Sequence, residues 1–234
     1  MSESVESQLL IDLKECLKNL KWNVNGVHLK SCKTVPYPKS PQAVAAMLED
    51  LAKMSLIPML KEKFDCEIEE GGAREYPDLT VKIAGKMYAI DIKTTRLEEK
   101  NKVSGFTLGT YTGYFLRPDE KTSAIKYPYS SYDGHIVCGI IYEWQEGATT
   151  EDMVKIVDII VQPKWKIASK RTGTGTTRHI KSVTELERLR LGRGDFESEE
   201  DFEKYWREKG RNLEERQKKR RGEREEEKSD ADEE

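Results

Sequence analysis

Two long apolar segments constrain the fold of this chain more than any other feature. Residues 136–142 (Ile-Val-Cys-Gly-Ile-Ile-Tyr) and 154–161 (Val-Lys-Ile-Val-Asp-Ile-Ile-Val) are rich in β-branched side chains. Near-continuous apolar strands of this kind are typical of sheet strands that are covered on both faces. We therefore expect two central strands, with a structural layer on each side of the sheet.

Helices and further strands are expected around these two segments. Residues 4–20 carry apolar side chains at three-and-four spacing, which predicts an amphipathic helix. Ser40-Pro41 supplies an N-cap and a first-turn proline for a second helix, which Pro58 is expected to kink or interrupt. Residues 78–83 and 87–93, joined by a turn at 84–86, read as paired strands. The fold class is thus α/β or α+β, with a central mixed sheet flanked by helices.

The two ends of the chain carry local signals of their own. Asn25-Gly26, between apolar residues, predicts a two-residue hairpin turn after the first helix. The segment Ser198-Glu-Glu-Asp201 resembles a capping box and predicts a helix that stops near Gly210. Residues beyond Arg211 are almost all charged or polar, so we expect frayed helix or disorder there.

Composition excludes some classes of protein and leaves others open. The chain has 4 cysteines, without a CxxC pair or zinc-ligand spacing, which favours free thiols in a reducing compartment. No signal peptide or membrane-length apolar run is present, so a cytoplasmic protein without membrane partners is expected. The formal net charge of −3 does not by itself indicate a nucleic-acid binder. Basic residues gathered on one face would still suffice to contact phosphates.

The chemistry-bearing pattern is Tyr76-Pro77-Asp78, then twelve residues, then Asp91-Ile92-Lys93. Side chains on a strand alternate between faces, so Asp91 and Lys93 should project to one side while Ile92 packs on the other. A hairpin between Asp78 and Asp91 would bring the two carboxylates together at one end of the sheet. The alternative interpretation is an exposed Asp and Lys that form a weak ion pair on an edge strand.

Two convergent carboxylates would form a hard oxygen site suited to Mg²⁺, which keeps several waters and also binds substrate phosphate. A metal there would activate a water and neutralise charge on the phosphorus. Lys93 beside it would position or deprotonate that water and stabilise the developing negative charge. The three groups are the minimum set for phosphodiester hydrolysis.

Several sequence blocks in a fixed order extend this motif into a family resemblance. The chain resembles the EcoRV family of type II restriction endonucleases, within the PD-(D/E)xK nuclease superfamily, from its first helix to about Trp206. The matching blocks are Asp91–Thr95, Phe106–Thr112, Tyr127-Pro128, Lys164–Ala168, Gly173–Thr177 and Phe196–Phe202 with Tyr205-Trp206.

That resemblance implies a restriction-endonuclease-like core and a homodimer that cuts double-stranded DNA under Mg²⁺, with Mn²⁺ as a substitute. Asp78 and Asp91 would be metal ligands together with the backbone carbonyl of Ile92, and Lys93 would be the catalytic lysine. The family also has a glutamate on its second helix. A gapless alignment places Asp50 there, with Glu49 adjacent, and solvated helix residues are the alternative for both.

The resemblance also implies a domain division and a set of DNA contacts. Residues 1–40 would form a dimerisation subdomain, 41–210 the catalytic and recognition core, and 211–234 a charged tail. Glycines let a recognition loop approach base edges, and threonines offer hydrogen bonds and a methyl group. A mobile loop and exposed strand threonines are the alternative interpretation. The expected DNA-contact residues are Arg74, Thr94, Thr95, Thr107, Thr112, Gly173, Thr174, Gly175, Thr176, Thr177 and Arg178.

Three functions follow, in order of preference. The first is a restriction endonuclease that leaves 5′-phosphate and 3′-hydroxyl ends, with GATATC and a blunt cut as the starting expectation and a companion methyltransferase in the host. Thr176 stands where the family has asparagine, and the loop before Tyr76, which is amide-rich in the family, reads Gly71-Gly72-Ala73-Arg74 here, so the recognised site is open. The other two are a structure- or damage-specific nuclease of the same superfamily and a non-catalytic DNA-binding module.

Overall fold

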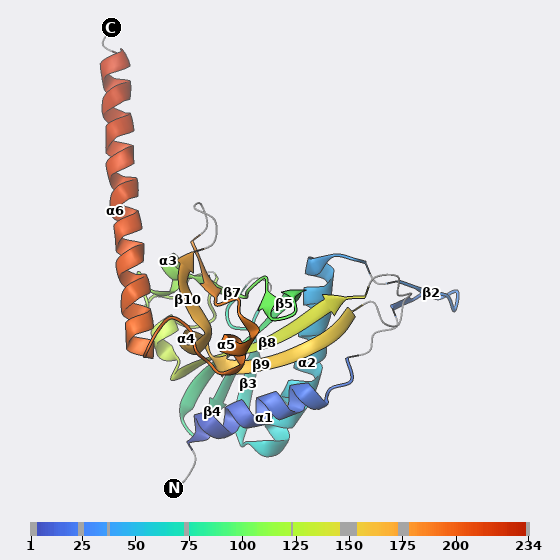
Figure 1. Ribbon diagram of the computed structural model, residues 1–234. Helices are drawn as coiled ribbons and strands as arrows, with labels where there is room; N and C mark the ends of the chain where they lie inside the picture. The colour runs from blue at the N-terminus through green and yellow to red at the C-terminus, as the bar shows by residue number, and fades with distance from the viewer. Residues whose placement is uncertain are drawn as a thin grey trace.

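The computed structural model (Figure 1) describes residues 4–22, 26–36, 38–72, 75–122, 124–145, 154–172 and 178–232, with side chains as far as Lys219. None of the helices within these ranges is long and apolar enough to cross a membrane. The elements, in chain order, are α1 Val5–Asn19, β1 Val27–His28, β2 Thr34–Val35, α2 Pro41–Lys63, β3 Cys66–Glu70, β4 Leu79–Ile83, β5 Lys86–Glu99, β6 Lys102–Val103, β7 Thr107–Thr110, α3 Tyr111–Tyr114, the 3₁₀ helix η1 Tyr129–Ser131, β8 Gly134–Trp144, β9 Val154–Pro163, α4 Lys164–Ile167, β10 Ala168–Thr172, β11 His179–Ser182, α5 Leu186–Arg190 and α6 Glu199–Asp232.

The main sheet has the strand order β3-β4-β5-β8-β9, and β6 pairs with the far end of β5. Only β5 and β8 run parallel among these described pairs, so the sheet is mixed as expected. The β4–β5 turn at Ala84-Gly85 has positive φ at both residues, 50° and 78°, as a tight two-residue hairpin turn requires. The predicted strand pair around 84–86 is confirmed.

Two hydrophobic cores lie on opposite faces of this sheet. Helices α1 and α2 cover one face, where their leucines pack against alternate residues of β4, β5 and β8 such as Val81, Ile90 and Ile136. The other face is covered by the smaller sheet β10-β11-β7 and by the short helices and the start of α6, through Phe106, Phe202 and Trp206. Figure 1 shows α1 and α2 on one side and α6 projecting from the other. The layered α/β architecture is confirmed.

The predicted helix starts are also confirmed. The Ser4 hydroxyl accepts a hydrogen bond from the backbone N–H of Ser7 at 3.2 Å, and the Ser40 hydroxyl from that of Ala43 at 3.4 Å. Helix α2 continues through Pro58 instead of being interrupted. The carbonyl that Pro58 leaves without a partner belongs to Met54, which is 72% exposed, so water can satisfy it.

The prediction that both long apolar strands are central was wrong for the second of them. Strand β8 is central, but β9 lies at the edge of the main sheet. Its apolar residues are nevertheless covered on both faces, because Ile159 and Ile160 enter opposite cores. An N-terminal hairpin pairs β1 with β2 and turns at residues 29–33, whereas the predicted turn at Asn25-Gly26 falls partly outside the described residues. Gly26 precedes β1 with φ 102°, and Asn25 lies outside the described residues.

The last helix extends much further than predicted. Helix α6 begins as expected, with the Ser198 hydroxyl accepting a hydrogen bond from the N–H of Asp201 at 3.1 Å, but it continues through Gly210 to Asp232. A Cβ atom on Gly210 would lie 2.8 Å from the side chain of Leu116. The glycine therefore permits close packing of the helix against that loop and does not act as a helix stop. Residues 211–232 are helical.

Candidate active site

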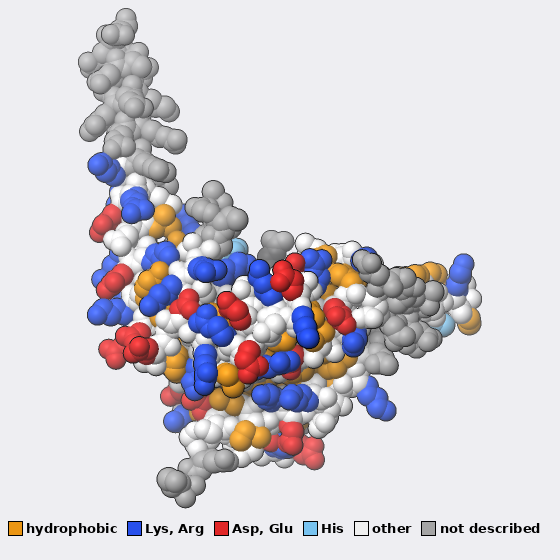
Figure 2. Space-filling model, in the orientation of Figure 1, with side chains coloured by type: hydrophobic (Ala, Val, Ile, Leu, Met, Phe, Trp, Pro, Cys, Tyr) orange, Lys and Arg blue, Asp and Glu red, His pale blue; other side chains and the backbone are white. Residues whose placement is uncertain are grey.

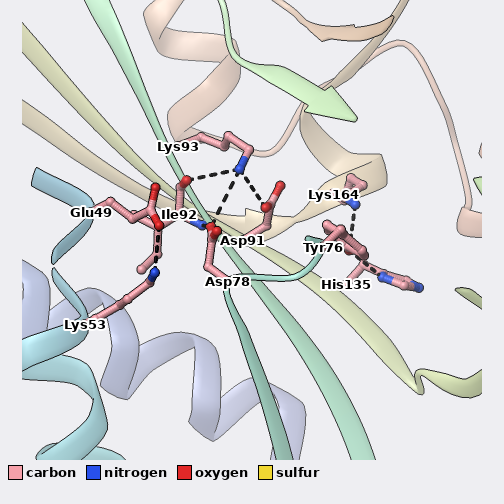
Figure 3. A network of polar contacts seen from close by, with 9 residues as sticks. All are labelled: Glu49, Lys53, Tyr76, Asp78, Asp91, Ile92, Lys93, His135 and Lys164. Carbon is pink, nitrogen blue, oxygen red and sulfur yellow. Dashed lines mark hydrogen bonds and ion pairs between the residues drawn. The ribbon is translucent and has the colours of Figure 1, made fainter. Parts of the chain in front are cut away.

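The β4–β5 pair brings Asp78, Asp91 and Lys93 together, as the alternation of side chains predicts. Leu79 pairs with Ile90, so Asp78 lies next to the Asp91-Ile92 step. The Lys93 Nζ atom is 2.6 Å from Asp91 Oδ1, 3.6 Å from Asp78 Oδ2 and 3.2 Å from the carbonyl oxygen of Ile92 (Figure 3). The backbone N–H of Ile92 donates to Asp78 Oδ2 at 2.6 Å. The three functional groups form one cluster.

The surface ion-pair alternative is wrong. Strand β5 lies inside the main sheet between β4 and β8, and the Asp91 side chain is only 4% exposed. Ile90 and Ile92 point into the core beneath α1 and α2, on the face opposite Asp91. Charged groups buried in this way are costly unless their charges are matched. The cluster is therefore an internal polar site.

The charges within the cluster are unbalanced. Burial, and then the negative charge of Asp91, raise the pKa of Asp78 to about 7. Burial disfavours the charged form of Lys93, but the attraction of Asp91 and Asp78 outweighs it and raises the Lys93 pKa above its ordinary value. Two carboxylates thus face a single ammonium group, and a cation would relieve their repulsion.

The donor set fits a magnesium-type ion. Among the described residues, no group of three or more Asp, Glu, His or Cys side chains converges on one point. Two carboxylates and a neighbouring carbonyl oxygen are enough for Mg²⁺, because this ion keeps several waters and also takes ligands from phosphate. Asp78, Asp91 and the Ile92 carbonyl supply that set.

The structure distinguishes Glu49 from Asp50 on α2. Glu49 is half-buried, accepts a hydrogen bond from Lys53 at 2.7 Å and contributes to raising the Asp78 pKa. Asp50 is exposed and is not among the described residues that line the cavity beside Asp78. Glu49, and not the position chosen by the gapless alignment, faces the site.

A cavity of about 550 Å³ opens beside the three-residue cluster. Its walls come from α2, the segment before β4, β5, the β7–α3 segment and the start of β11, and they include Glu49, Asp78, Asp91, Lys93, Thr107 and His179. Among the described residues that line the cavity, Thr107 is the one that was predicted to contact DNA. Its hydroxyl accepts a hydrogen bond from Lys181 at 2.6 Å.

The remaining predicted DNA-contact residues are dispersed. Thr94 and Thr112 are half-buried, and Arg178 is exposed with its carbonyl oxygen accepting from the Tyr111 N–H at 3.1 Å. Thr95 is 4% exposed, and its hydroxyl has no hydrogen-bond partner among the described residues. Arg74 and Gly173, Thr174, Gly175, Thr176 and Thr177 lie outside the described residues.

Comparison with known proteins addresses the identity of the site. The family described as restriction endonuclease EcoRV matches residues 18–227. The chain is also 31% identical over 224 residues to the type II restriction enzyme EcoRV of Escherichia coli, an alignment that covers 87% of this chain and 88% of that enzyme.

The chain belongs to the EcoRV restriction endonuclease family. It is accordingly a type II restriction endonuclease, a site-specific hydrolase of double-stranded DNA. Restriction endonucleases generally use divalent metal ions, which agrees with the donor set around Asp78 and Asp91. Family membership sets aside the non-catalytic DNA-binding module among the three functions considered.

Proposed function

We propose that this endonuclease uses Mg²⁺ to cut both strands of a short palindrome, leaving 5′-phosphate and 3′-hydroxyl ends. The supporting observation is the cluster of Asp78, Asp91 and Lys93 in the wall of an open cavity. Asp78, Asp91 and the Ile92 carbonyl would hold the ion, and Mn²⁺ would substitute for it. When bound, such an ion lowers the pKa of a water and neutralises phosphate charge.

Each side chain of the cluster has a distinct role in this proposal. Asp78 is fixed by the N–H of Ile92, and Asp91 by Lys93, so both carboxylates are oriented before DNA arrives. Lys93 stays protonated because its pKa is raised. It therefore donates hydrogen bonds to the attacking water and to the non-bridging phosphate oxygens, and stabilises the charge that develops there. Glu49, from α2 in the lining of the same cavity, would add a water contact.

We take GATATC with a blunt cut as the first site to test. The recognition loop at 173–177 differs from the family pattern at Thr176, and Arg178 follows it. Arginine reads guanine through two parallel hydrogen bonds, so an altered or extended site would involve Arg178 first. Figure 2 shows basic and acidic side chains intermixed over the face drawn there.

We also propose a homodimer in which residues 1–40 carry much of the contact. Ile11, Val27 and Leu29 are exposed by 48%, 42% and 40%, three of the five exposed large apolar residues in the described chain. Apolar side chains exposed on a small hairpin are typical of an interface. Residues 41–210 would then form the catalytic core and 211–234 a charged extension. We place the enzyme in the cytoplasm, where a companion methyltransferase protects host DNA.

Incubation with plasmid DNA and Mg²⁺ is expected to give discrete fragments, since a palindrome is read at fixed positions. EDTA should abolish the reaction and Mn²⁺ should restore it. Sequencing the fragment ends identifies both the site and the cut position. Sedimentation at micromolar concentration should give twice the chain mass. Random degradation, or cutting restricted to branched or mismatched DNA, would contradict the proposal.

The adjacent acids on α2 offer a matched pair of variants. Glu49→Gln is expected to slow single-turnover cleavage by roughly tenfold, because one oriented water contact contributes about 1.4 kcal/mol. Asp50→Asn removes the same charge one position away, where the side chain is exposed, and should leave the rate unchanged. Equal effects of the two substitutions would show that α2 acts only through its overall charge.

A further inference from the structure

Lys164, the first residue of α4, is a buried lysine outside the three-residue cluster. It is 1% exposed and directly follows β9. Burial lowers the pKa of Lys164 to about 7, although the nearby charge of Asp91 opposes that shift. Lysine is rarely fully buried without an ionic partner, so its place here calls for a reason.

Aromatic rings and one hydroxyl surround the Lys164 amine. The Nζ atom donates a hydrogen bond to the hydroxyl of Tyr76 at 2.6 Å. It also lies 3.9 Å, 5.0 Å and 5.4 Å from the ring centres of Tyr76, Tyr114 and Tyr129. No carboxylate among the described residues forms an ion pair with it.

The hydrogen-bond chain continues from Tyr76 to His135. The Tyr76 hydroxyl lies 2.7 Å from His135 Nδ1 (Figure 3), and the His135 ring stacks on that of Tyr129 with ring centres 3.7 Å apart. Burial, and then the charge of Lys164, lower the pKa of His135 well below its ordinary value, so the imidazole is neutral. Lys164 donates to the Tyr76 hydroxyl, which shares a second hydrogen bond with His135 Nδ1.

The middle member of these hydrogen bonds, Tyr76, belongs to the segment that precedes β4 and carries Asp78. Tyr76 lies two residues before Asp78, and both line the cavity. The backbone of Tyr76 is held independently, since its N–H donates to the Ala124 carbonyl at 2.9 Å and its carbonyl accepts from the Lys126 N–H at 2.8 Å. What Lys164 adds is the orientation of the Tyr76 side chain, which belongs to the aromatic core and also lines the cavity beside Asp78.

Stability gives no reason to keep a lysine at this position. An apolar side chain of similar length would fill the same space without the cost of burying an amine. Buried polar groups that reduce stability are typical of sites that require a fixed geometry. The competing interpretation is that Lys164 serves only to fill space in the core.

We propose that Lys164 is a positioning residue for DNA cleavage: through the hydroxyl of Tyr76 it fixes the Tyr76 side chain in the cavity wall beside Asp78, so that Asp78 and Asp91 face a common ion. The inference rests on the proposed function. The proposed role of Lys164 depends on its hydrogen bond to the Tyr76 hydroxyl. The Lys164 amine can donate this bond in either protonation state.

Two variants of equal length separate the hydrogen bond from packing. Lys164→Met removes the donor, and Lys164→Gln keeps one. We expect Lys164→Met to cleave about tenfold more slowly in single turnover and to bind Mn²⁺ about tenfold more weakly, measured by electron paramagnetic resonance of free Mn²⁺. Its melting temperature should be unchanged or higher. Lys164→Gln should recover most of the lost rate and affinity.

Tyr76→Phe keeps the ring but removes the hydroxyl, and should reproduce the Lys164→Met defect even if the latter fails to fold. Tyr132→Phe is the matched control. Its hydroxyl is also buried in the aromatic core, where it bonds Thr80 at 2.9 Å, but it is not part of the Lys164 chain. This control should lose stability and retain the wild-type rate and Mn²⁺ affinity.

The possible outcomes separate the two levels of inference. Wild-type cleavage and Mn²⁺ affinity in both Lys164→Met and Tyr76→Phe would overturn the role of Lys164, as would equal losses in Tyr132→Phe. A wild-type chain that cuts no DNA would refute the proposed function instead. The Mn²⁺ affinities of the variants would still decide the positioning role in that case.

Discussion

Asp91→Ala is expected to reduce DNA cleavage at least about a thousandfold, because removal of a metal ligand eliminates roughly 4 kcal/mol of transition-state stabilisation. Asp91 also forms the shortest contact to Lys93, at 2.6 Å, so the variant leaves the amine with the Ile92 carbonyl at 3.2 Å and the Asp78 carboxylate at 3.6 Å. The measurement is the single-turnover rate on a duplex that contains the site identified by end sequencing.

Asp158→Ala is a suitable control for that experiment. Asp158 is a partly buried aspartate on β9 of the same sheet, but its carboxylate pairs with Arg190 at 2.6 Å and does not line the cavity as described. We expect it to lose stability and to cut DNA at the wild-type rate. Asp91→Ala activity within tenfold of wild type would remove Asp91 from the catalytic centre.

Asp78→Asn should have opposite effects on activity and on stability. Cleavage should fall about a thousandfold, for the same reason as in Asp91→Ala. The metal-free variant, however, should be more stable than wild type at pH 8. Burial and the neighbouring Asp91 raise the pKa of Asp78 to about 7, so the ionised form is disfavoured in the folded protein.

The sign of the pH dependence follows from proton binding. In the unfolded chain an aspartate has a pKa of about 3.9. Between roughly pH 4 and 7, Asp78 therefore binds more protons in the folded chain than in the unfolded chain. The contribution of Asp78 to stability is therefore present at low pH and is lost as the pH rises through 7. Urea unfolding in EDTA at pH 5 and pH 8 should show this fall in wild type and a smaller one in Asp78→Asn.

Asp50→Asn provides the control, because it removes a carboxylate at an exposed position. Addition of Mg²⁺ at pH 8 should raise the melting temperature of wild type and of Asp50→Asn, since a ligand that binds only the folded state stabilises it. Asp78→Asn should not respond. A parallel pH dependence in all three proteins would show that Asp78 is not the titrating group.

The clustering of Asp78, Asp91 and Lys93 was predictable because it depends on local rules. Strand alternation places Asp91 and Lys93 on one face, and the turn at Ala84-Gly85 sets the register that brings Asp78 to them. The Glu49 position was not predictable from spacing alone. Successive residues on a helix point about 100° apart, so a shift of one residue in an alignment selects a different face.

The Lys164 chain could not be predicted from the sequence. Tyr76, His135 and Lys164 come from three distant segments, and no periodic pattern links them. Their contact depends on the tertiary packing of β8, β9 and the aromatic core. The wrong prediction at Gly210 has a similar cause, since the close approach of Leu116 explains the glycine and comes from a remote loop. Local sequence signals identify candidate functional residues, but tertiary packing decides which of these residues meet in space.

The parallel pairing of β5 with β8 has a consequence for biosynthesis. Asp91 pairs with Val137 across a crossover that contains β6, β7, α3 and η1. Strand β5 therefore lacks its second neighbour until the ribosome has released residues 134–144, and such non-local pairing forms slowly. We expect truncated nascent chains that lack β8 to leave the chromosome uncut, because the sheet around Asp91 is incomplete until β8 has been synthesised.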